Sequence, residues 1–372
     1  MDCAGPCQFA GMLLADLGAT LIRIGRPLEP TAGDLLPPQF DFVGRGRPLV
    51  RVDLRKRAGL EFVLQLCPSS DALLEGFRPG TMERLGLGPD PCRARNPALV
   101  YGRATGWGQH GPLAPRAGHD VNFLALSGAL YCMREADRRP VPPLNLLGDF
   151  GSGGMLLAVG VLSALFERHH SGRGQIVDAA MIDGVLLMMT WLHGFAAAGQ
   201  WRQAPGCNLL DGGSPMYNVY ETADGGYLAV GALEGKFYRE FLDKLGLDPA
   251  GAMSDYAPEN WAAARSRIAQ AVRARTRAHW SKIFADANAC ATPVLSPEES
   301  MRHPHQVARE AFVRVGDYMQ PAPAPRFERM STDTPKAANA VSLSETLKSF
   351  GIPQSATDLL TAQGVLTVSS AP

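Results

Sequence analysis

The stretch FAGMLLADLGATLIRIGRP, residues 9–27, sets the fold class of this chain. Its first half is an apolar helical pattern that ends at Gly18, and glycine commonly ends helices because it adopts positive φ without strain. The β-branched run TLIRI follows directly and predicts a short strand. A helix that passes so quickly into a strand is typical of an α/β domain.

The same alternation continues to residue 108. PLVRVDL at 48–54 predicts a strand and RAGLEFVLQLC at 57–67 a helix. SDALLEGF predicts another strand, PGTMERLGLG a short helix, and PALVYGRATGWG at 97–108 a strand that runs into a loop. Strands that alternate with helices usually form a parallel sheet, so we expect an α/β domain with a mainly parallel sheet.

The overall composition excludes several classes of protein. The 372 residues are 46% hydrophobic and 19% charged, with 36 basic and 36 acidic residues and no formal net charge. That balance argues against a general nucleic-acid binder or a membrane-surface binder, which would carry a basic excess. The seven cysteines form no CxxC pair, which predicts free thiols in a reducing compartment.

Targeting signals are also lacking in the sequence. The longest apolar runs, such as MLLAVGVLSAL at 155–165, are shorter than a bilayer requires, and MDCAGPCQF has no basic or apolar signal-peptide region. The final SSAP is not a peroxisomal tripeptide of the SKL type. We therefore expect a cytoplasmic protein.

One carboxylate stands out in NLLGDFGSGG, residues 145–154. Asp149 precedes a glycine-rich stretch and a long apolar helix, which we expect to begin near Ser152 or Gly153. There it either caps the helix or lies in the field of its N-terminus, whose free N–H groups can bind a second negative centre. Gly151, Gly153 and Gly154 are costly inside a helix, which favours close approach of a ligand.

Two other side chains are candidates for proton transfer. His119 lies in RAGHDVNF at 116–123, and an imidazole titrates near neutral pH, but seven other histidines compete with it. Glu234 lies where a predicted hairpin ends, beside Gly235, in a position typical of solvated surface. Position alone therefore assigns neither residue.

The C-terminal half predicts a different organisation. IVDAAMIDGVLLMMTWLHGFAAAG at 176–199 predicts a second long, buried helix, followed by a Gly- and Pro-rich linker at 203–215. PMYNVYETADGGYLAVGALE at 215–234 predicts a hairpin, with helices near 236–246, 259–275 and 278–287. YMQPAPAPRF at 318–327 predicts a tether, and 344–366 predicts two short helices.

Basic residues gather at the ends of the predicted strands, where ligands of open α/β sheets bind. They are Arg26, Arg45, Arg47, Arg55, Arg78 and Arg84. Each alone is typical of surface, and together they suggest an anion site. The sequence holds no GxGxxG fingerprint, P-loop, GxSxG elbow or metal-ligand cluster.

Several of these stretches together resemble the family III CoA-transferase superfamily. They are FAGMLLADLGATLIRIGRP, LLEGFRPGTMERLGLGP, GRATGWGQHGPLAPRAGHDVNFLALSGAL, PLNLLGDFGSGGM, GRGQIVDAAMIDG, LDGGSPMYNVYETADGGYLAVGALE and ACATPVLSPEE. Within the superfamily the motifs look most like those of its 2-methylacyl-CoA racemases. The resemblance covers about residues 5 to 366.

The resemblance implies an interlocked homodimer with a Rossmann-like large domain and a small α+β domain. Residues 1–200 would begin the large domain, 201–300 would form the small domain, and 301–372 would be a linker that returns to the large domain. The active site would lie between the large domain of one subunit and the small domain of the other.

The resemblance also implies roles for residues. His119 and Asp149 match the acid/base pair of the family, Glu234 matches the glutamate that pairs with the histidine, and Tyr217 matches an active-site aromatic residue. Gly151 and Gly153 would line the substrate pocket. The positions that match CoA contacts are Arg26, Val52, Asp53, Leu54, Arg55, Arg78, Arg84, Ala117, Gly118, Asp120, Val121 and Asn122.

The implied reaction fits these residue types. Racemisation at C2 of a 2-methylacyl-CoA thioester removes a proton from one face of the carbon and returns one to the other, which needs a base and an acid on opposite sides. The backbone N–H groups of the glycine-rich stretch would stabilise the enolate between the two steps. The acyl-CoA thioester is the substrate, and no metal or redox cofactor is required.

Two departures from the family are visible. Members usually begin with a strand before a GPGP-like loop, whereas this sequence starts almost at that loop and reads GPCQ. Members also tend to carry a basic residue where Pro48 stands. We therefore expect differences at the sheet edge and in phosphate contacts.

Two other functions remain open at this point. In a CoA-transferase of the same superfamily, the acid aligned with Asp149 is a nucleophile that forms an acyl anhydride and then a CoA thioester. A non-catalytic acyl-CoA-binding protein would tolerate the loss of His119, Asp149 and Glu234, and all three are present.

Overall fold

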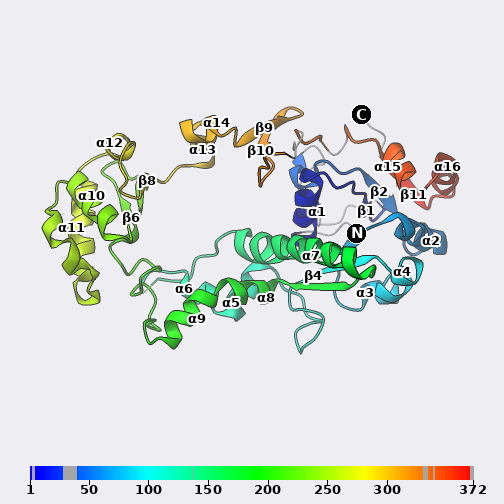
Figure 1. Cartoon of the computed structure of the whole chain (residues 1–372), viewed down its shortest axis with the longest axis horizontal. Helices are drawn as coiled ribbons and strands as arrows, with labels where there is room; N and C mark the ends of the chain where they lie inside the picture. The colour runs from blue at the N-terminus through cyan, green and yellow to red at the C-terminus, as the bar shows by residue number, and fades with distance from the viewer. Residues whose placement is uncertain (2–4, 28–39, 137, 330–333, 338–339, 369–372) are drawn as a thin grey trace. The chain divides into compact units, whose positions relative to one another are not determined.

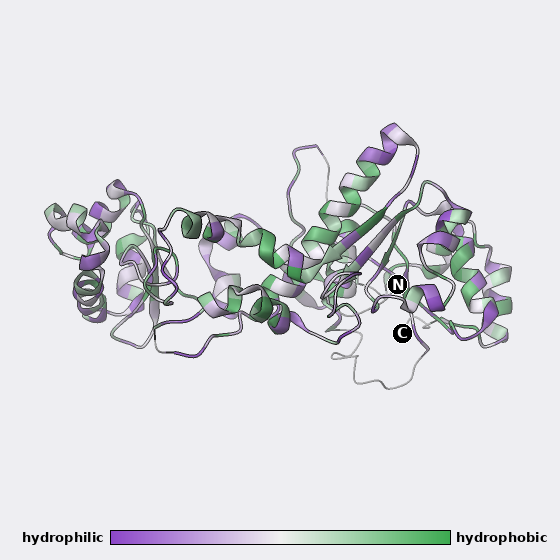
Figure 2. Cartoon of the chain, turned by 90° about the horizontal axis from the view of Figure 1, so that it is seen from below, coloured by the Kyte–Doolittle hydropathy of each residue, from purple (hydrophilic) through white to green (hydrophobic). Residues whose placement is uncertain are grey.

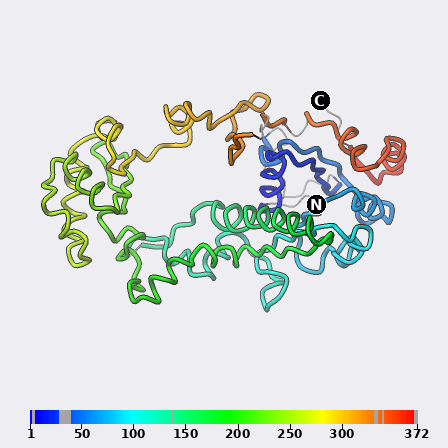
Figure 3. Tube along the Cα trace, in the orientation of Figure 1, coloured from blue at the N-terminus to red at the C-terminus, as the bar shows by residue number. Residues whose placement is uncertain are grey.

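The computed structural model in Figure 1 describes residues 1, 5–27, 40–136, 138–329, 334–337 and 340–368. The chain divides into two compact units. Unit 1 consists of Met1–Ser127, Pro143–Met188 and Val307–Pro372, and unit 2 of Gly128–Pro142 and Met189–Gln306. Figure 3 traces the chain through both units. Residues 128–142 and 189–200, which the sequence placed with the large domain, therefore cluster with unit 2.

Unit 1 contains two three-stranded sheets. In the first, β1 (Arg23–Gly25) pairs in parallel with β2 (Leu49–Val52), and β11 (Leu366–Val368) pairs antiparallel with β2. In the second, β3 (Ala72–Glu75), β4 (Val100–Thr105) and β5 (Ile176–Ala180) are all parallel. The predicted α/β class with mainly parallel pairing is confirmed.

Helices from both ends of the chain cover the first sheet. The buried face of α2 (Arg57–Leu66), formed by Phe62, Val63 and Leu66, packs in one core with Leu347 of α15 (Leu343–Ser349). The helix α16 (Gln354–Ala362) leads into β11. Because β11 pairs with β2, the C-terminal segment is part of the same fold as the first strands.

The second sheet carries the longest helix of the described residues. The π-helical segment η4 (Leu146–Met155) continues into α7 (Leu156–Ser171), a run of 26 residues that is apolar along much of its length and polar at its C-terminal end (Figure 2). By length and composition this run could cross a bilayer, whereas the sequence analysis expected its apolar segments to be too short. The core helices of soluble proteins can have the same length and composition. Leu157, Val161 and Ala164 pack in one core with Val100 and Ala104 of β4, so one face of α7 covers the second sheet.

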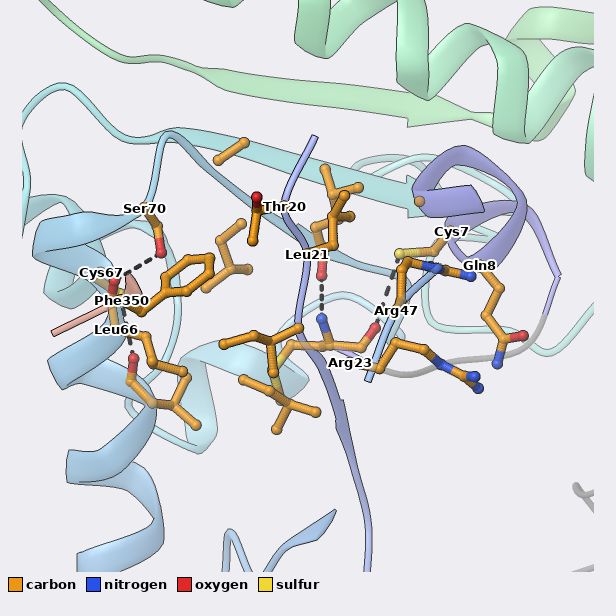
Figure 4. Close-up of a pocket in the computed structure, with 18 residues that line it drawn as sticks. Cys7, Gln8, Thr20, Leu21, Arg23, Arg47, Leu66, Cys67, Ser70 and Phe350 are labelled. Atoms are coloured by element: carbon orange, nitrogen blue, oxygen red, sulfur yellow. Dashed lines mark hydrogen bonds between the residues drawn. The ribbon is translucent and has the colours of Figure 1, made fainter. Parts of the chain in front are cut away.

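The two sheets of unit 1 are not joined by strand pairing, since β1 and β3 are not hydrogen-bonded neighbours. A cavity of about 120 Å³ is lined by residues of both strands. Figure 4 shows Arg23 of β1 and Leu21, which precedes this strand, in the pocket, with Phe350 and the end of α2 on one side and Cys7 of α1 (Pro6–Asp16) on the other. The amino group of Met1 donates to the carbonyl oxygen of Leu74 at 2.6 Å.

Two predicted elements of this region are wrong. Residues 176–199 do not form one helix, because 176–180 pair with β4 as strand β5, and two helices follow, α8 (Met181–Met188) and α9 (Thr190–Ala197). The predicted tether at 318–327 begins as strand β10 (Tyr318–Pro321), paired antiparallel with β9 (Phe312–Val315). The buried guanidinium of Arg45 holds this hairpin, since it pairs with Asp16 at 2.5 Å and donates to the carbonyl oxygen of Pro321 at 2.7 Å.

Unit 2 is built around a small antiparallel sheet. The predicted hairpin is present as β6 (Tyr217–Glu221) and β7 (Tyr227–Gly231), and β8 (Ala291–Pro293) pairs with β7. The predicted helices are present as α10 (Gly235–Lys244), α11 (Trp261–Arg273) and α12 (Arg277–Phe284). They pack on the sheet through one core that includes Tyr238, Phe241 and Trp280.

Candidate active site

A cavity of about 590 Å³ lies in unit 1 at the carboxyl ends of β1, β3 and β4. Arg26 follows β1, Phe77 and Arg78 follow β3, and Trp107 follows β4. Ligands of α/β sheets bind at this edge because the loops after the strands converge there. The start of α1, the loop with His119, and the segment with Asn145, Asp149 and Phe150 complete the lining.

Asp149 lies inside a helix rather than ahead of one. The backbone N–H of Phe150 donates to the carbonyl oxygen of Asn145 at 3.3 Å, five residues back, which is the π-helical pattern of η4. The helix therefore begins at Leu146 and not near Ser152 as predicted. π-Helical turns are rare and occur frequently at functional sites. This turn places the half-buried side chain of Asp149 in the cavity lining.

The glycines around Asp149 serve helix packing. A Cβ on Gly153 would lie 2.7 Å from Cβ of Pro6 and 2.8 Å from Cγ of Met181, and one on Gly154 would lie 2.7 Å from the ring of Phe9. The room is thus taken by α1 and α8 rather than by the ligand expected from the sequence, and Gly151 and Gly153 do not line the cavity. Both residues lie beyond the first turn of the helix. The oxyanion hole expected from the glycine-rich stretch stays a prediction.

The surroundings of Asp149 favour its protonated form. Burial raises the pKa of the Asp149 carboxyl, and the nearby Asp120 carboxylate raises this pKa further. A hydrogen bond with Asn145 and the charge of His119 act in the opposite direction, and the raised pKa is the net result. A carboxyl that keeps its proton to higher pH than an ordinary aspartate is suited to act as a general acid.

His119 is exposed on a loop whose backbone is firmly held. Its N–H donates to Oδ1 of Asn122 at 3.0 Å, and its carbonyl oxygen accepts from the N–H of Asn122 at 2.8 Å, at the start of α5 (Asp120–Ser127). Just before it, Gly118 lies against Trp107 and Phe123, and a Cβ there would come within 3.0 Å of both rings. The two rings meet edge to face with centroids 4.7 Å apart.

Three guanidinium groups line the same cavity. They belong to Arg26, Arg78 and Arg116, all exposed, and none forms an ion pair within the described residues. Arg26 lies over the ring of Phe77 at 5.9 Å from its centroid. Uncompensated positive charge at a strand edge can bind phosphate or another anion. The sequence reasoning missed Arg116, although it stands next to the AGHDVN motif.

The other predicted CoA contacts divide into two groups. Ala117 and Gly118 line the cavity. Val52, Asp53, Leu54, Arg55, Arg84, Asp120, Val121 and Asn122 do not. Val52 is a core residue at 1% exposure, and the exposed Arg55 is paired with Asp53 at 2.9 Å, which lowers the pKa of the Asp53 carboxyl. The basic residues Arg45 and Arg47 are buried and structural.

Glu234 and Tyr217 belong to unit 2. Glu234 is the residue before α10, and Tyr217 begins β6 with 43% of its surface exposed. The structure places His119 and Asp149 together in unit 1 and these two in the other unit. The pairing of Glu234 with His119 therefore stays a prediction.

Comparison with known proteins shows the family of this chain. The chain is 40% identical over 354 residues to the α-methylacyl-CoA racemase of Mus musculus, which covers 94% of this chain and 91% of that protein. It is 39% identical over 323 residues to the racemase of the same name from Homo sapiens, covering 86% of this chain and 82% of that one. The crystal structure of a CAIB/BAIF family protein from Brucella suis shares the fold, with a TM-score of 0.74, 23% identity, and coverage of 90% of this chain and 91% of that chain. The family model for CoA-transferase family III matches residues 3–341, and the chain belongs to that family.

Proposed function

We propose that this protein racemises 2-methylacyl-CoA thioesters by transferring a proton at C2, with His119 and Asp149 as the two acid/base groups. The observation that carries the proposal is their common location. Both side chains line one cavity, at the strand edge where α/β proteins bind ligands. The 39–40% identity to racemases acting on such thioesters supports the choice of substrate.

The proposed reaction needs no outside reagent. In one direction, neutral His119 removes the proton from C2, and the electron pair of the broken C–H bond moves onto the thioester oxygen as an enolate. The protonated Asp149 carboxyl then gives its proton to the opposite face of C2, and the enolate collapses to the thioester. The enzyme is left with imidazolium and carboxylate, which is the form that runs the reverse reaction.

Other groups would bind and orient the substrate. Arg26, Arg78 and Arg116 would hold the phosphates of CoA, since guanidinium groups form paired hydrogen bonds with phosphate. Glu234 would fix the tautomer of His119 and stabilise its cation, supplied within a homodimer in the arrangement that the family resemblance implies. We propose no metal and no redox cofactor, so EDTA should leave activity unchanged.

The test is proton exchange at C2. A (2R)-2-methylacyl-CoA is incubated with the protein in D2O, and deuterium uptake and loss of stereochemistry at C2 are followed by NMR. Racemisation with deuterium incorporation is expected. Absence of exchange, with CoA passed to an added carboxylate, would instead identify a CoA-transferase that uses Asp149 as nucleophile.

A further inference from the structure

Asp120 is a buried carboxylate that the proposed chemistry does not use. It begins α5 directly after His119 and is 7% exposed. Its Oδ2 accepts the backbone N–H of Asp149 at 2.9 Å, whereas its Oδ1 is buried without a hydrogen-bond partner. Buried carboxylate oxygens are normally hydrogen-bonded, because an unsatisfied one costs stability. A structural anchor alone would not account for the unsatisfied oxygen.

The helix is shaped to admit this carboxylate. A Cβ on Gly148 would lie 2.5 Å from Oδ2 and 2.8 Å from Cγ of Asp120, so a side chain other than hydrogen at residue 148 would displace the Asp120 carboxylate. Gly148 precedes Asp149 in the π-helical turn. The Asp120 carboxylate therefore packs against Gly148 and holds the backbone N–H of Asp149 in the same turn.

The charged groups around Asp149 come from few elements. The loop before α5 contributes His119, α5 contributes Asp120, and Arg26, Arg78 and Arg116 line the shared cavity. Next to Asp149, α1 presents Gly5 and Pro6, and the ionisable Asp183 of α8 is exposed. In the sheet, Arg103 of β4 is paired with Glu75 and Glu83, and Asp178 of β5 accepts from the N–H of Gln109.

We propose that Asp120 is a positioning residue of the proton transfer: it holds the backbone at Asp149 and opposes negative charge on the Asp149 side chain. The inference rests on the proposed function for its kinetic consequence. Asp120 is never protonated or deprotonated by the substrate in this scheme. It acts only through Asp149, by keeping that carboxyl able to carry the proton it delivers to C2.

Two substitutions separate the two effects. Asp120→Asn keeps an oxygen that can accept the N–H of Asp149 but removes the charge. In the direction in which the Asp149 carboxylate is the base, kcat falls at low pH as this carboxylate is protonated. This acid limb of the kcat profile should move to lower pH by about one unit in Asp120→Asn, because an aspartate without a like charge beside it ionises more readily. Asp120→Ala also removes the acceptor, and kcat should fall about tenfold below the Asn variant at equal KM, as the turn loses its anchor.

The matched control is Asp183→Asn, which removes one carboxylate from the exposed surface of the neighbouring α8. Its pH profile should coincide with that of the unmodified protein. Direct titration of the Asp149 carboxyl by ¹³C NMR, assigned with Asp149→Asn, should show a lower pKa in Asp120→Asn. If Asp120→Asn does not fold, Gly148→Ala serves instead, because its methyl group would displace the Asp120 carboxylate. This variant should reproduce the fall in kcat expected for Asp120→Ala.

The outcomes are distinguishable. An unshifted pH profile and an unshifted Asp149 titration in Asp120→Asn would overturn the inference, as would a loss of thermal stability with kcat and pH profile intact. If the unmodified protein itself shows no exchange at C2, the proposed function fails. The NMR titration then still decides whether Asp120 controls Asp149.

Discussion

Asp149 lies in a π-helical turn against which α1, α5 and α8 pack, whereas His119 is exposed on a loop that ends where α5 begins. Asp149 has a backbone anchor in Asp120, and the Asn145 side chain favours the ionised form of its carboxyl, which lowers its pKa. For the imidazole of His119, the described residues show no hydrogen bond, and only its backbone is held. Both side chains nevertheless line the same cavity.

The two members of the proposed acid/base pair therefore have different surroundings. Asp149 is tuned by groups within unit 1, through burial and a neighbouring charge. His119 has an exposed imidazole that is available to a group from elsewhere, and Glu234 in unit 2 is the group that the family resemblance suggests. Asp149 should therefore depend on residues of unit 1 alone, whereas His119 should depend also on Glu234 of unit 2.

The largest effect is expected for Asp149→Asn. Loss of the acid/base group should slow exchange at C2 by about 10²–10⁴-fold, measured by NMR in D2O. The same substitution should increase the stability of the fold at pH values where Asp149 is ionised. Because the pKa of Asp149 is raised in the folded protein, the fold binds this proton more tightly than the unfolded chain does, and ionisation above that pKa costs stability.

The contribution of Asp149 to the free energy of unfolding should therefore fall as pH rises above the ordinary aspartate pKa and level off above the folded pKa, while carboxyls with a lowered pKa, such as Asp53, contribute in the opposite direction. Asp149→Asn should lack this slope, as followed by urea denaturation at a series of pH values. An Asn variant that exchanges C2 protons at the normal rate would remove Asp149 from the mechanism.

His119→Gln should come next, with a loss of about 10²-fold in exchange and little change in stability, because the side chain is exposed. Glu234→Gln should reduce exchange at C2 less, about tenfold, because the proposed pairing with His119 would lose its charge. An unchanged exchange rate in Glu234→Gln would show that His119 acts without a group from unit 2.

Gly153→Ala tests the packing of the acid side. The added methyl group would press on Pro6 and Met181, so the variant should lose about 1–3 kcal/mol of stability and some activity with it. Gly194→Ala in α9 is the matched control, because a Cβ there meets nothing within 4 Å. It should be neutral or gain up to about 1 kcal/mol. Equal thermal unfolding of both variants would contradict the packing role of Gly153.

The smallest effect is expected for Arg78→Ala, which should raise KM about tenfold with kcat unchanged. The increase in KM caused by Arg78→Ala should be smaller at high salt, because screening weakens the interaction of exposed charges with phosphate. Steady-state kinetics at two ionic strengths measure both quantities. A fall in kcat at constant KM would place Arg78 in the chemical step instead of in binding.

The sequence allowed much of the fold to be predicted, because its signals are local. Glycine at position 18 and the β-branched run after it indicated the α/β class, and the Asp-Gly turn indicated the hairpin of unit 2. The failures lay where tertiary contacts override local pattern. Residues 176–180 are continuous with an apolar helical pattern in the sequence, but they pair with β4, which gives their backbone hydrogen bonds, and the β-branched Ile176 and Val177 are suited to a strand.

For the candidate site, the motifs of the sequence by themselves indicated the family to which the chain belongs and made His119 and Asp149 the candidates for proton transfer. Only the tertiary structure decided what surrounds them. In the sequence, the glycines after Asp149 suggest close approach of a ligand, but α1 and α8 occupy the space beside Gly153 and Gly154. The family resemblance places Asp120 among the CoA contacts, but its carboxylate accepts the backbone N–H of Asp149. Arg116, which the sequence alone did not indicate, lines the cavity. Which atoms share a cavity, and so which charges shift a pKa, depends on segments far apart in the chain that meet only when the strands and helices pack.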